Sequence, residues 1–207
     1  MTLGRLVFLL ALLGAAWWLW HGDRPVVHGP GELAPQTPLQ TSTDGGKLRL
    51  KGHTLRPLAH FEVEARVLSR EDYRFDRGAE LAPVDLALGW GPMSDERVLD
   101  QIDISQGGRW YRWSVRQFPI PRREIERNSA NMHLIPADEA VEDAIRDAHP
   151  GDLVRFSGEL VEASGPDGWH WRSSLTRDDT GAHACELVLV QRFRVVDDAR
   201  PLGARGG

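Results

Sequence analysis

The stretch that decides the fold is Phe61-Glu62-Val63-Glu64-Ala65-Arg66-Val67, in which apolar and charged side chains alternate strictly. Successive side chains of a β-strand point to opposite faces of a sheet, so this pattern predicts a strand with one buried face. The same alternation occurs over residues 47–51. We therefore expect the chain to fold around a mainly antiparallel sheet, since antiparallel sheets commonly keep one face in water.

The last third of the chain is also rich in predicted strands. Residues 153–161 and 185–196 are mostly apolar runs, and Trp169 and Trp171 alternate with polar neighbours. The sequence Gly-Pro-Asp-Gly at residues 165–168 indicates a turn between two of these strands. A sheet of this size can curl into a small barrel.

Helices are expected to be few and short. Four are predicted: one that Pro83 opens and that runs through Leu86 and Leu88, one capped by Ser94 over residues 95–99, one headed by Pro121 over 122–127, and an amphipathic one over 138–148. A hairpin is expected between residues 102–104 and 110–115, with its turn at 106–108. The predicted class is therefore α+β, mainly antiparallel sheet with a few short helices.

The N-terminus predicts a membrane helix. Residues 6–20 carry no charge, follow Arg5 and end in Trp17, Trp18 and Trp20, which suit a membrane interface. The run spans roughly 22 Å, short of the ~30 Å hydrocarbon core, so local thinning is expected. We interpret residues 1–22 as a transmembrane signal-anchor that leaves Arg5 in the cytoplasm. The alternative is a cleaved signal peptide, which the small residues at 14–16 also fit.

The chain after this helix divides into three parts. Residues 23–46 hold four prolines and several glycines, which predicts a flexible linker without packed elements. Residues 47–198 form the expected soluble domain, and residues 199–207 a disordered tail. The protein is thus expected in the inner membrane, single-pass, with its C-terminal domain in the periplasm or outside the cell.

Composition narrows the classes of function. The chain has 30 acidic and 25 basic residues, a net charge of -5, whereas a nucleic-acid binder needs a basic face. Cys185 is the single cysteine, so neither an intramolecular disulfide nor a zinc site built mainly of thiolates is expected. A soft copper-like site is weighed and not favoured, because its potential ligands are scattered: Met93, Met132, His133, His183 and Cys185. We expect neither a metal nor a cofactor.

Cys185 is the candidate nucleophile if the protein is an enzyme. His183 or His133 could form a thiol–imidazolium pair with it, and Asp178 or Asp179 could orient the imidazole. The competing interpretation, which we favour, is that Cys185 is a small buried residue at the start of the last strand.

Aromatic residues suggest a binding site instead. A groove for a sugar or a peptide could use stacking on Trp90, Trp110, Tyr111, Trp113, Trp169 and Trp171. Core packing is the competing explanation for each of these rings. The residues taken as ligand-binding candidates are Trp90, Met93, Asn131, His133, Trp169 and Arg177.

Several motifs carry resemblances. One set consists of residues 85–95, 109–111 and 129–136, Trp169 with 173–177, and Cys185-Glu186. Through these motifs the chain resembles, over residues 61–190, a family of uncharacterised bacterial membrane-anchored or exported proteins. That likeness implies one domain in a membrane or export context and no particular activity. Residues 151–158 are similar to the first strands of OB-like barrels. We expect a membrane-tethered extracytoplasmic domain that binds a protein partner or envelope ligand. The alternative is a thiol-dependent hydrolase or transferase using Cys185.

Overall fold

The computed structural model describes Arg5 and residues 26–176 and 185–196. Of residues 1–22, where the membrane helix is predicted, all except Arg5 lie outside the described residues, and so does the predicted tail. Within the described residues, no helix is long and apolar enough to cross a membrane.

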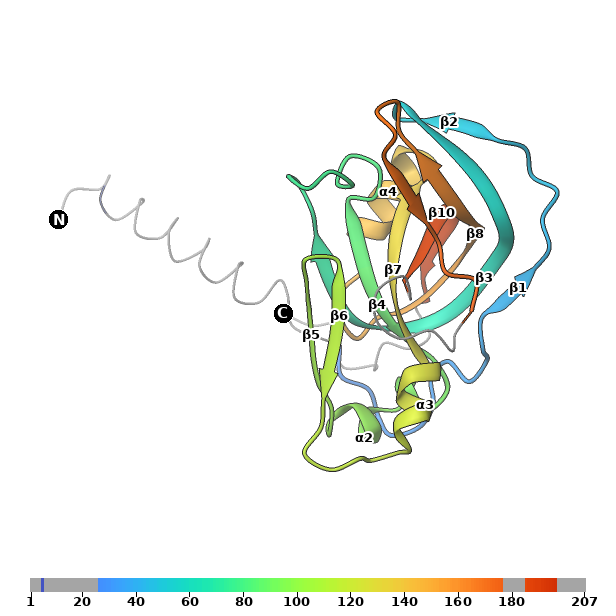
Figure 1. Ribbon diagram of the computed structural model, residues 1–207. Helices are drawn as coiled ribbons and strands as arrows, with labels where there is room; N and C mark the ends of the chain where they lie inside the picture. The colour runs from blue at the N-terminus through green and yellow to red at the C-terminus, as the bar shows by residue number, and fades with distance from the viewer. Residues whose placement is uncertain (1–4, 6–25, 177–184, 197–207) are drawn as a thin grey trace.

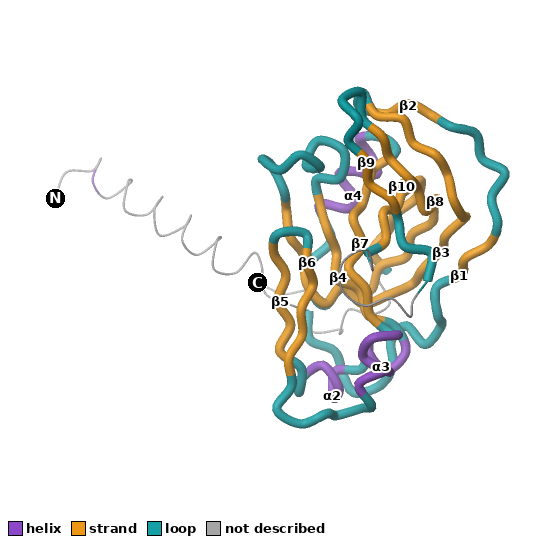
Figure 2. The backbone as a smooth tube through the Cα atoms, viewed as in Figure 1, coloured by secondary structure: helices purple, strands orange, loops and turns teal. Residues whose placement is uncertain are grey.

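Strands dominate the fold and curve around a common core (Figure 1). They are β1 (Leu39–Thr41), β2 (Leu48–Leu50), β3 (His53–Asp72), β4 (Val84–Gly89), β5 (Asp103–Gly107), β6 (Trp110–Ser114), β7 (Ser129–Pro136), β8 (Leu153–Ser164), β9 (His170–Arg172) and β10 (Glu186–Val195). The helices are short: η1 (Gly91–Ser94), α2 (Glu96–Leu99), α3 (Arg122–Arg127) and α4 (Glu139–Arg146). Figure 2 shows α2 and α3 at one end of the sheet and α4 at the other. The prediction of a sheet-dominated fold with few short helices is confirmed.

Five strands form a ring in the order β3, β4, β7, β10, β8 and back to β3. The ring can close because β3 is 20 residues long and pairs with β8 along one part and with β4 along the other. All pairs in the ring are antiparallel except β7 with β10, so the sheet is mixed. The alternating stretch at residues 61–67 lies in β3 and places Phe61, Val63, Ala65 and Val67 in the core, as predicted.

One glycine permits close contact between β8 and β10. A Cβ atom on Gly158 would lie 1.9 Å from the carbonyl oxygen of Leu189, well inside contact distance. The pairing register of β10 with β8 also shifts nearby, between Val190 and Arg192. A side chain at position 158 would therefore force these two ring strands apart.

Two local predictions are wrong. The helix expected after Pro83 is strand β4, whose six residues are all buried. Both faces of β4 are buried, so its sequence shows no alternation of apolar and polar residues. Periodicity alone does not separate such a buried strand from a helix. The cap of α2 is Asp95, whose carboxylate accepts from the Arg97 N–H at 3.0 Å. The hydroxyl of Ser94 instead accepts from the N–H groups of Leu33 and Ala34.

The expectation of a free linker is corrected for residues 26–41. Val26 N–H donates to the carbonyl of Pro150 at 2.9 Å, and Gly31 N–H donates to the Asp95 carboxylate at 3.0 Å. Ala34 is buried in the core, and β1 pairs with β3. Proline and glycine did not prevent this docking, because the segment's backbone groups find acceptors on loops of the domain.

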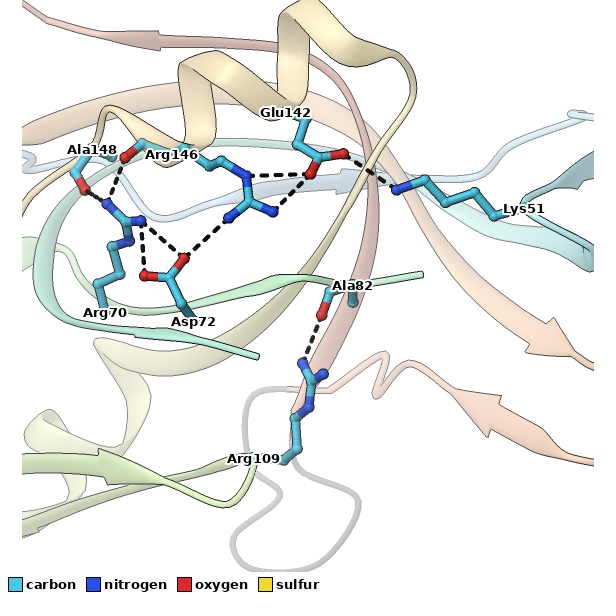
Figure 3. Close-up of polar contacts among 8 residues, drawn as sticks. All are labelled: Lys51, Arg70, Asp72, Ala82, Arg109, Glu142, Arg146 and Ala148. Carbon is cyan, nitrogen blue, oxygen red and sulfur yellow. Dashed lines mark hydrogen bonds and ion pairs between the residues drawn. The ribbon is translucent and has the colours of Figure 1, made fainter. Parts of the chain in front are cut away.

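A chain of ion pairs holds α4 against the sheet (Figure 3). The guanidinium of Arg70, on β3, donates to the carbonyls of Arg146 at 2.5 Å and Ala148 at 3.0 Å, and also pairs with Asp72. Arg146 continues the chain through Glu142, at 2.8 Å. A cation at the C-terminal end of a helix satisfies its last carbonyls and complements its dipole.

Replacing Arg70 with alanine is expected to lower the unfolding free energy by about 1.5–3 kcal/mol, because two helix-end carbonyls lose a charged donor. Urea denaturation followed by circular dichroism measures this change. Arg49→Ala, at an exposed position on β2, is the matched control and should stay within about 0.5 kcal/mol of wild type. Equal stabilities of the two variants would show that Arg70 does not anchor the helix.

Candidate functional site

The hairpin of β5 and β6 lies over the outside of the ring, with β5 against β3 and β6 against β7 (Figure 1). Its turn consists of Gly108 and Arg109, both at positive φ, 60° and 68°. Two such residues in succession are typical of the tight turn that matches the twist of a hairpin. The predicted hairpin is therefore confirmed, with its turn at Gly108 and Arg109 where residues 106–108 were expected.

Arg109 joins this turn to the ring. Its guanidinium pairs with Asp76 through two contacts of 2.9 Å and with Asp85 at 2.7 Å. It also donates to the carbonyl of Ala82 at 2.9 Å, as Figure 3 shows. The planar fork of an arginine can serve several acceptors at once, which makes Arg109 the hub of this region.

Aromatic rings enclose the same guanidinium. Arg109 lies 3.6 Å from the ring centroid of Tyr73 and 5.4 Å from that of Trp171. The hydroxyl of Tyr73 accepts from the backbone N–H of Arg109 at 2.8 Å. Burial raises the pKa of Tyr73 to about 12, so this hydroxyl stays protonated at neutral pH. The turn is thus held by charge, by ring contacts and by a backbone hydrogen bond.

Asp85 is the buried anion of the site. It has no exposed surface and faces two cationic or potentially cationic groups, Arg109 and His133, whose Nδ1 lies 2.9 Å away. Asn131 approaches the same carboxylate at 3.5 Å and also receives a hydrogen bond from Gln106 at 2.6 Å. A buried carboxylate needs such partners, because burying it alone would be very costly.

These polar groups share the outer face of the ring. On β4 and β7 their neighbours Leu86, Met132 and Leu134 belong to the core cluster inside the ring. Because side chains alternate along a strand, Asp85, Asn131 and His133 point the other way, towards the hairpin and Trp171. The rings of His133 and Trp171 have centroids 4.6 Å apart.

Asp85, Arg109, Asn131 and His133 form a polar cluster, and two cavities flank it. The first cavity, of about 700 Å³, is lined by Trp90, residues 110–115, Phe118, Arg122, Glu126, residues 129–131, Thr176, Cys185 and Glu186. The second cavity, of about 650 Å³, is lined by residues 76–78, Arg109, Trp110, His133, residues 169–172 and Cys185. Trp110 and Cys185 border both cavities, so the two are neighbours on one face of the molecule.

The structure separates the predicted ligand-binding residues into three groups. Trp90 and Met93 are fully buried, although Trp90 also borders the first cavity. Asn131 and His133 belong to the polar cluster, and Trp169 lines the second cavity. The remaining candidates lie outside the described residues: Arg177, Asp178, Asp179 and His183.

Sequence reasoning missed Asp85 and Arg109 as site residues. Both head a motif on which the family resemblance rests, and Asp85 interrupts an apolar run between Val84 and Leu86. A single charge inside a buried strand is the signal that could have identified it, since buried charges are almost always paired.

Cys185 borders both cavities but has the chemistry of a protonated thiol. Burial raises its pKa from an ordinary 9.0 to about 11, although a hydrogen bond with Asn131 lowers it in part. The thiolate, which is the nucleophilic form, is therefore scarce at neutral pH. Within the described residues, no group of three or more histidine, cysteine or acidic side chains could hold a metal ion.

This raised pKa gives a testable expectation for Cys185. At pH 8 the folded protein should react with iodoacetamide about 100-fold more slowly than the protein unfolded in urea, because the pKa of the Cys185 thiol is about 11 in the fold and 9.0 ordinarily. The rate should increase about tenfold for each pH unit up to pH 10, as the thiolate fraction grows. Mass spectrometry of the alkylated chain measures both. Rapid labelling of the native protein at pH 7 would contradict the assignment.

Comparisons with known proteins give no match for this chain. No protein-family model, no curated protein and no solved structure matches it. The features of this chain that bear on its function are the two cavities and the polar cluster between them.

Proposed function

We propose that the protein is a membrane-tethered binding domain without a catalytic role, and that its ligand occupies the first cavity. The observation that carries this proposal is the lining of that cavity, in which Trp110, Tyr111, Trp113 and Phe118 gather beside a few polar groups. Cavities of roughly 300–1,000 Å³ that combine aromatic walls with a few polar side chains are typical of ligand sites.

The architecture supports a ligand site on this face of the ring. We propose that the ring is an OB-type barrel, with β3, β4, β7, β8 and β10 as its five strands in chain order. Barrels of this type bind ligands over their second and third strands, between the loop after the first strand and the loop after the fourth. Both cavities here border β7, and the second also borders residues 76–78 and 169–172 from those two loops. Residues 151–158, which resemble the first strands of OB-like barrels, would then lead into its fourth strand, β8.

The cellular setting is part of the proposal. The uncharged run at residues 6–20 favours anchoring in the inner membrane, with the domain in the periplasm or outside the cell. A net charge of -5 disfavours a nucleic-acid ligand. An envelope protein or another envelope ligand is the partner that fits both features.

A photo-crosslinking amino acid in place of Phe118 tests this function. Phe118 is 49% exposed and lines the first cavity, so we expect a discrete crosslinked product in membranes of cells that express the full chain. The same amino acid in place of Arg49, exposed on β2, is the matched control and should give none. The product should also disappear when Trp110→Ala is combined with the probe. Crosslinking that is equal at both positions, or absent at Phe118, would reject the proposed site.

One observation favours the second candidate, a thiol-dependent hydrolase or transferase. Cys185 and His133 both line the second cavity, and Asp85 lies 2.9 Å from His133. The raised pKa of the thiol argues against this candidate. Cys185→Ser removes the nucleophile with little change in size, so an unchanged cellular phenotype would eliminate the enzyme.

A further inference from the structure

We infer that the ligand of the first cavity is an extended polypeptide segment that pairs with β6 along the edge that faces away from β5. This inference rests on the proposed binding function and specifies the class of its ligand. It follows from three features of the described residues: the pairing of β6, the way β6 borders the cavity, and the charge of the surrounding wall.

The strand β6 has one strand partner, β5, in the part of the chain that the structure describes. Within the described residues it forms a two-stranded sheet with β5, in a register that joins Gly107 to Trp110 and Asp103 to Ser114. In a hairpin closed by a two-residue turn, the pair next to the turn is hydrogen-bonded and every second pair follows it. The backbone groups of Tyr111 and Trp113 therefore point to the edge that faces away from β5. Such an edge is a template for another strand.

The first cavity runs along that edge. All six residues from 110 to 115 line it, although successive side chains of a strand point to opposite faces. A cavity that follows the edge of a strand borders neighbours of both orientations, as this one does. The start of β7 and the residues Thr176 and Cys185 line the same space. The cavity therefore has room beside β6 in the place that an added strand would take.

An extended polypeptide suits this arrangement better than a sugar. Its own N–H and C=O groups can satisfy those of Tyr111 and Trp113, which is the basis of recognition by strand addition. Alternate side chains of the added strand would then enter the aromatic part of the cavity. Trp113 contacts Phe118, with ring centroids 6.2 Å apart, and Tyr111 donates to Ser129 at 3.3 Å, so both rings are already held in place.

Charge specifies the other side chains of the segment. The charged residues that line the first cavity are Arg112, Arg122, Glu126 and Glu186, and Arg122 is already paired with Glu126 at 2.8 Å. Arg112 is therefore the cation of this wall that an added strand would meet. Arg112 is exposed on β6 beside the cavity, and Arg122 lies over Trp113, 5.8 Å from its ring centroid. Opposite charges across an interface favour encounter and set the register of binding. The segment should therefore place apolar residues at alternate positions and carry aspartate or glutamate where it faces Arg112.

Random 12-residue peptides displayed on phage, selected on the full chain in lipid nanodiscs, test this inference. We expect enriched peptides to place apolar residues at alternate positions and to carry aspartate or glutamate, and to lose at least tenfold in affinity against Arg112→Glu. Arg49→Glu, the matched charge reversal on β2, should leave affinity within twofold. In hydrogen exchange, an enriched peptide should protect the amides of Tyr111 and Trp113.

Backbone methylation of an enriched peptide then separates strand pairing from other binding. N-methyl groups on alternate residues should abolish binding in one register and spare it in the other, because only one edge of the added strand faces β6. The inference is overturned if no peptide is enriched, if both registers tolerate methylation, or if bacterial cell-wall glycans on an array bind instead. Crosslinking at Phe118 would still succeed in these cases if the binding function itself is right.

Discussion

Replacing Asp85 with alanine is expected to lower the free energy of unfolding by about 3–5 kcal/mol, because it breaks a buried ion pair from one side. Asp85 is fully buried, and its removal leaves Arg109 and His133 facing each other without their shared anion. Arg109 joins the hairpin turn to the ring, so the hairpin should also loosen. We expect faster hydrogen exchange over residues 103–114 than in wild type.

Urea denaturation of the purified domain measures the first effect, and amide hydrogen exchange the second. Asp76→Ala is the matched control, because Asp76 pairs with the same arginine but is 37% exposed. It should cost less than about 1 kcal/mol, as exposed ion pairs contribute little. If the two variants are equally stable, the buried cluster does not hold the hairpin.

Trp90→Ala is the second large effect and should also cost about 3–5 kcal/mol. The side chain of Trp90 is 1% exposed and belongs to the core cluster, so its removal leaves a large cavity. Its backbone is fixed as well, since its N–H donates to the carbonyl of Asn128 at 2.9 Å. Thermal unfolding followed by circular dichroism measures the loss.

Trp110→Ala is the matched comparison for Trp90. Trp110 is 41% exposed at the meeting of the two cavities, so its replacement should change stability by less than about 1 kcal/mol. A small loss of stability for Trp90→Ala together with a large loss for Trp110→Ala would show that Trp110, and not Trp90, is the core residue. From the sequence alone, each tryptophan could be a core residue or a ligand-binding residue. Trp90 lies between two glycines and Trp110 lies in a predicted strand, and neither setting decides between core and surface.

The ring could be predicted only in part. The strict alternation at residues 61–67 identifies β3 because one face of that stretch is solvated. No such contrast exists in β4, where all six residues are buried, and a helix was predicted there. Ring closure depends on contacts between distant residues, such as Gly158 against Leu189, which no local pattern encodes. Residues 26–41 dock for the same reason, through acceptors that lie far along the chain.

The candidate site could also be predicted only in part from the sequence. The unusual motifs around Asn131, His133 and Trp169 predict a role in binding, and the structure places the three residues at or beside the polar cluster. The partnership of Asp85 with Arg109 spans 24 residues and exists only because the hairpin folds back over β4. The cavity along β6 depends in addition on which edge of the hairpin lacks a strand partner among the described residues.

Binding of the crosslinked ligand to purified variants tests the central claim most directly. Isothermal titration should show at least a tenfold loss of affinity for Trp110→Ala, with an unchanged melting temperature. Phe75→Ala, which removes an aromatic ring that is 98% exposed and outside the lining of both cavities, should bind within twofold of wild type. Equal affinities for wild type and Trp110→Ala would contradict the claim that the aromatic cavity beside β6 is the binding site.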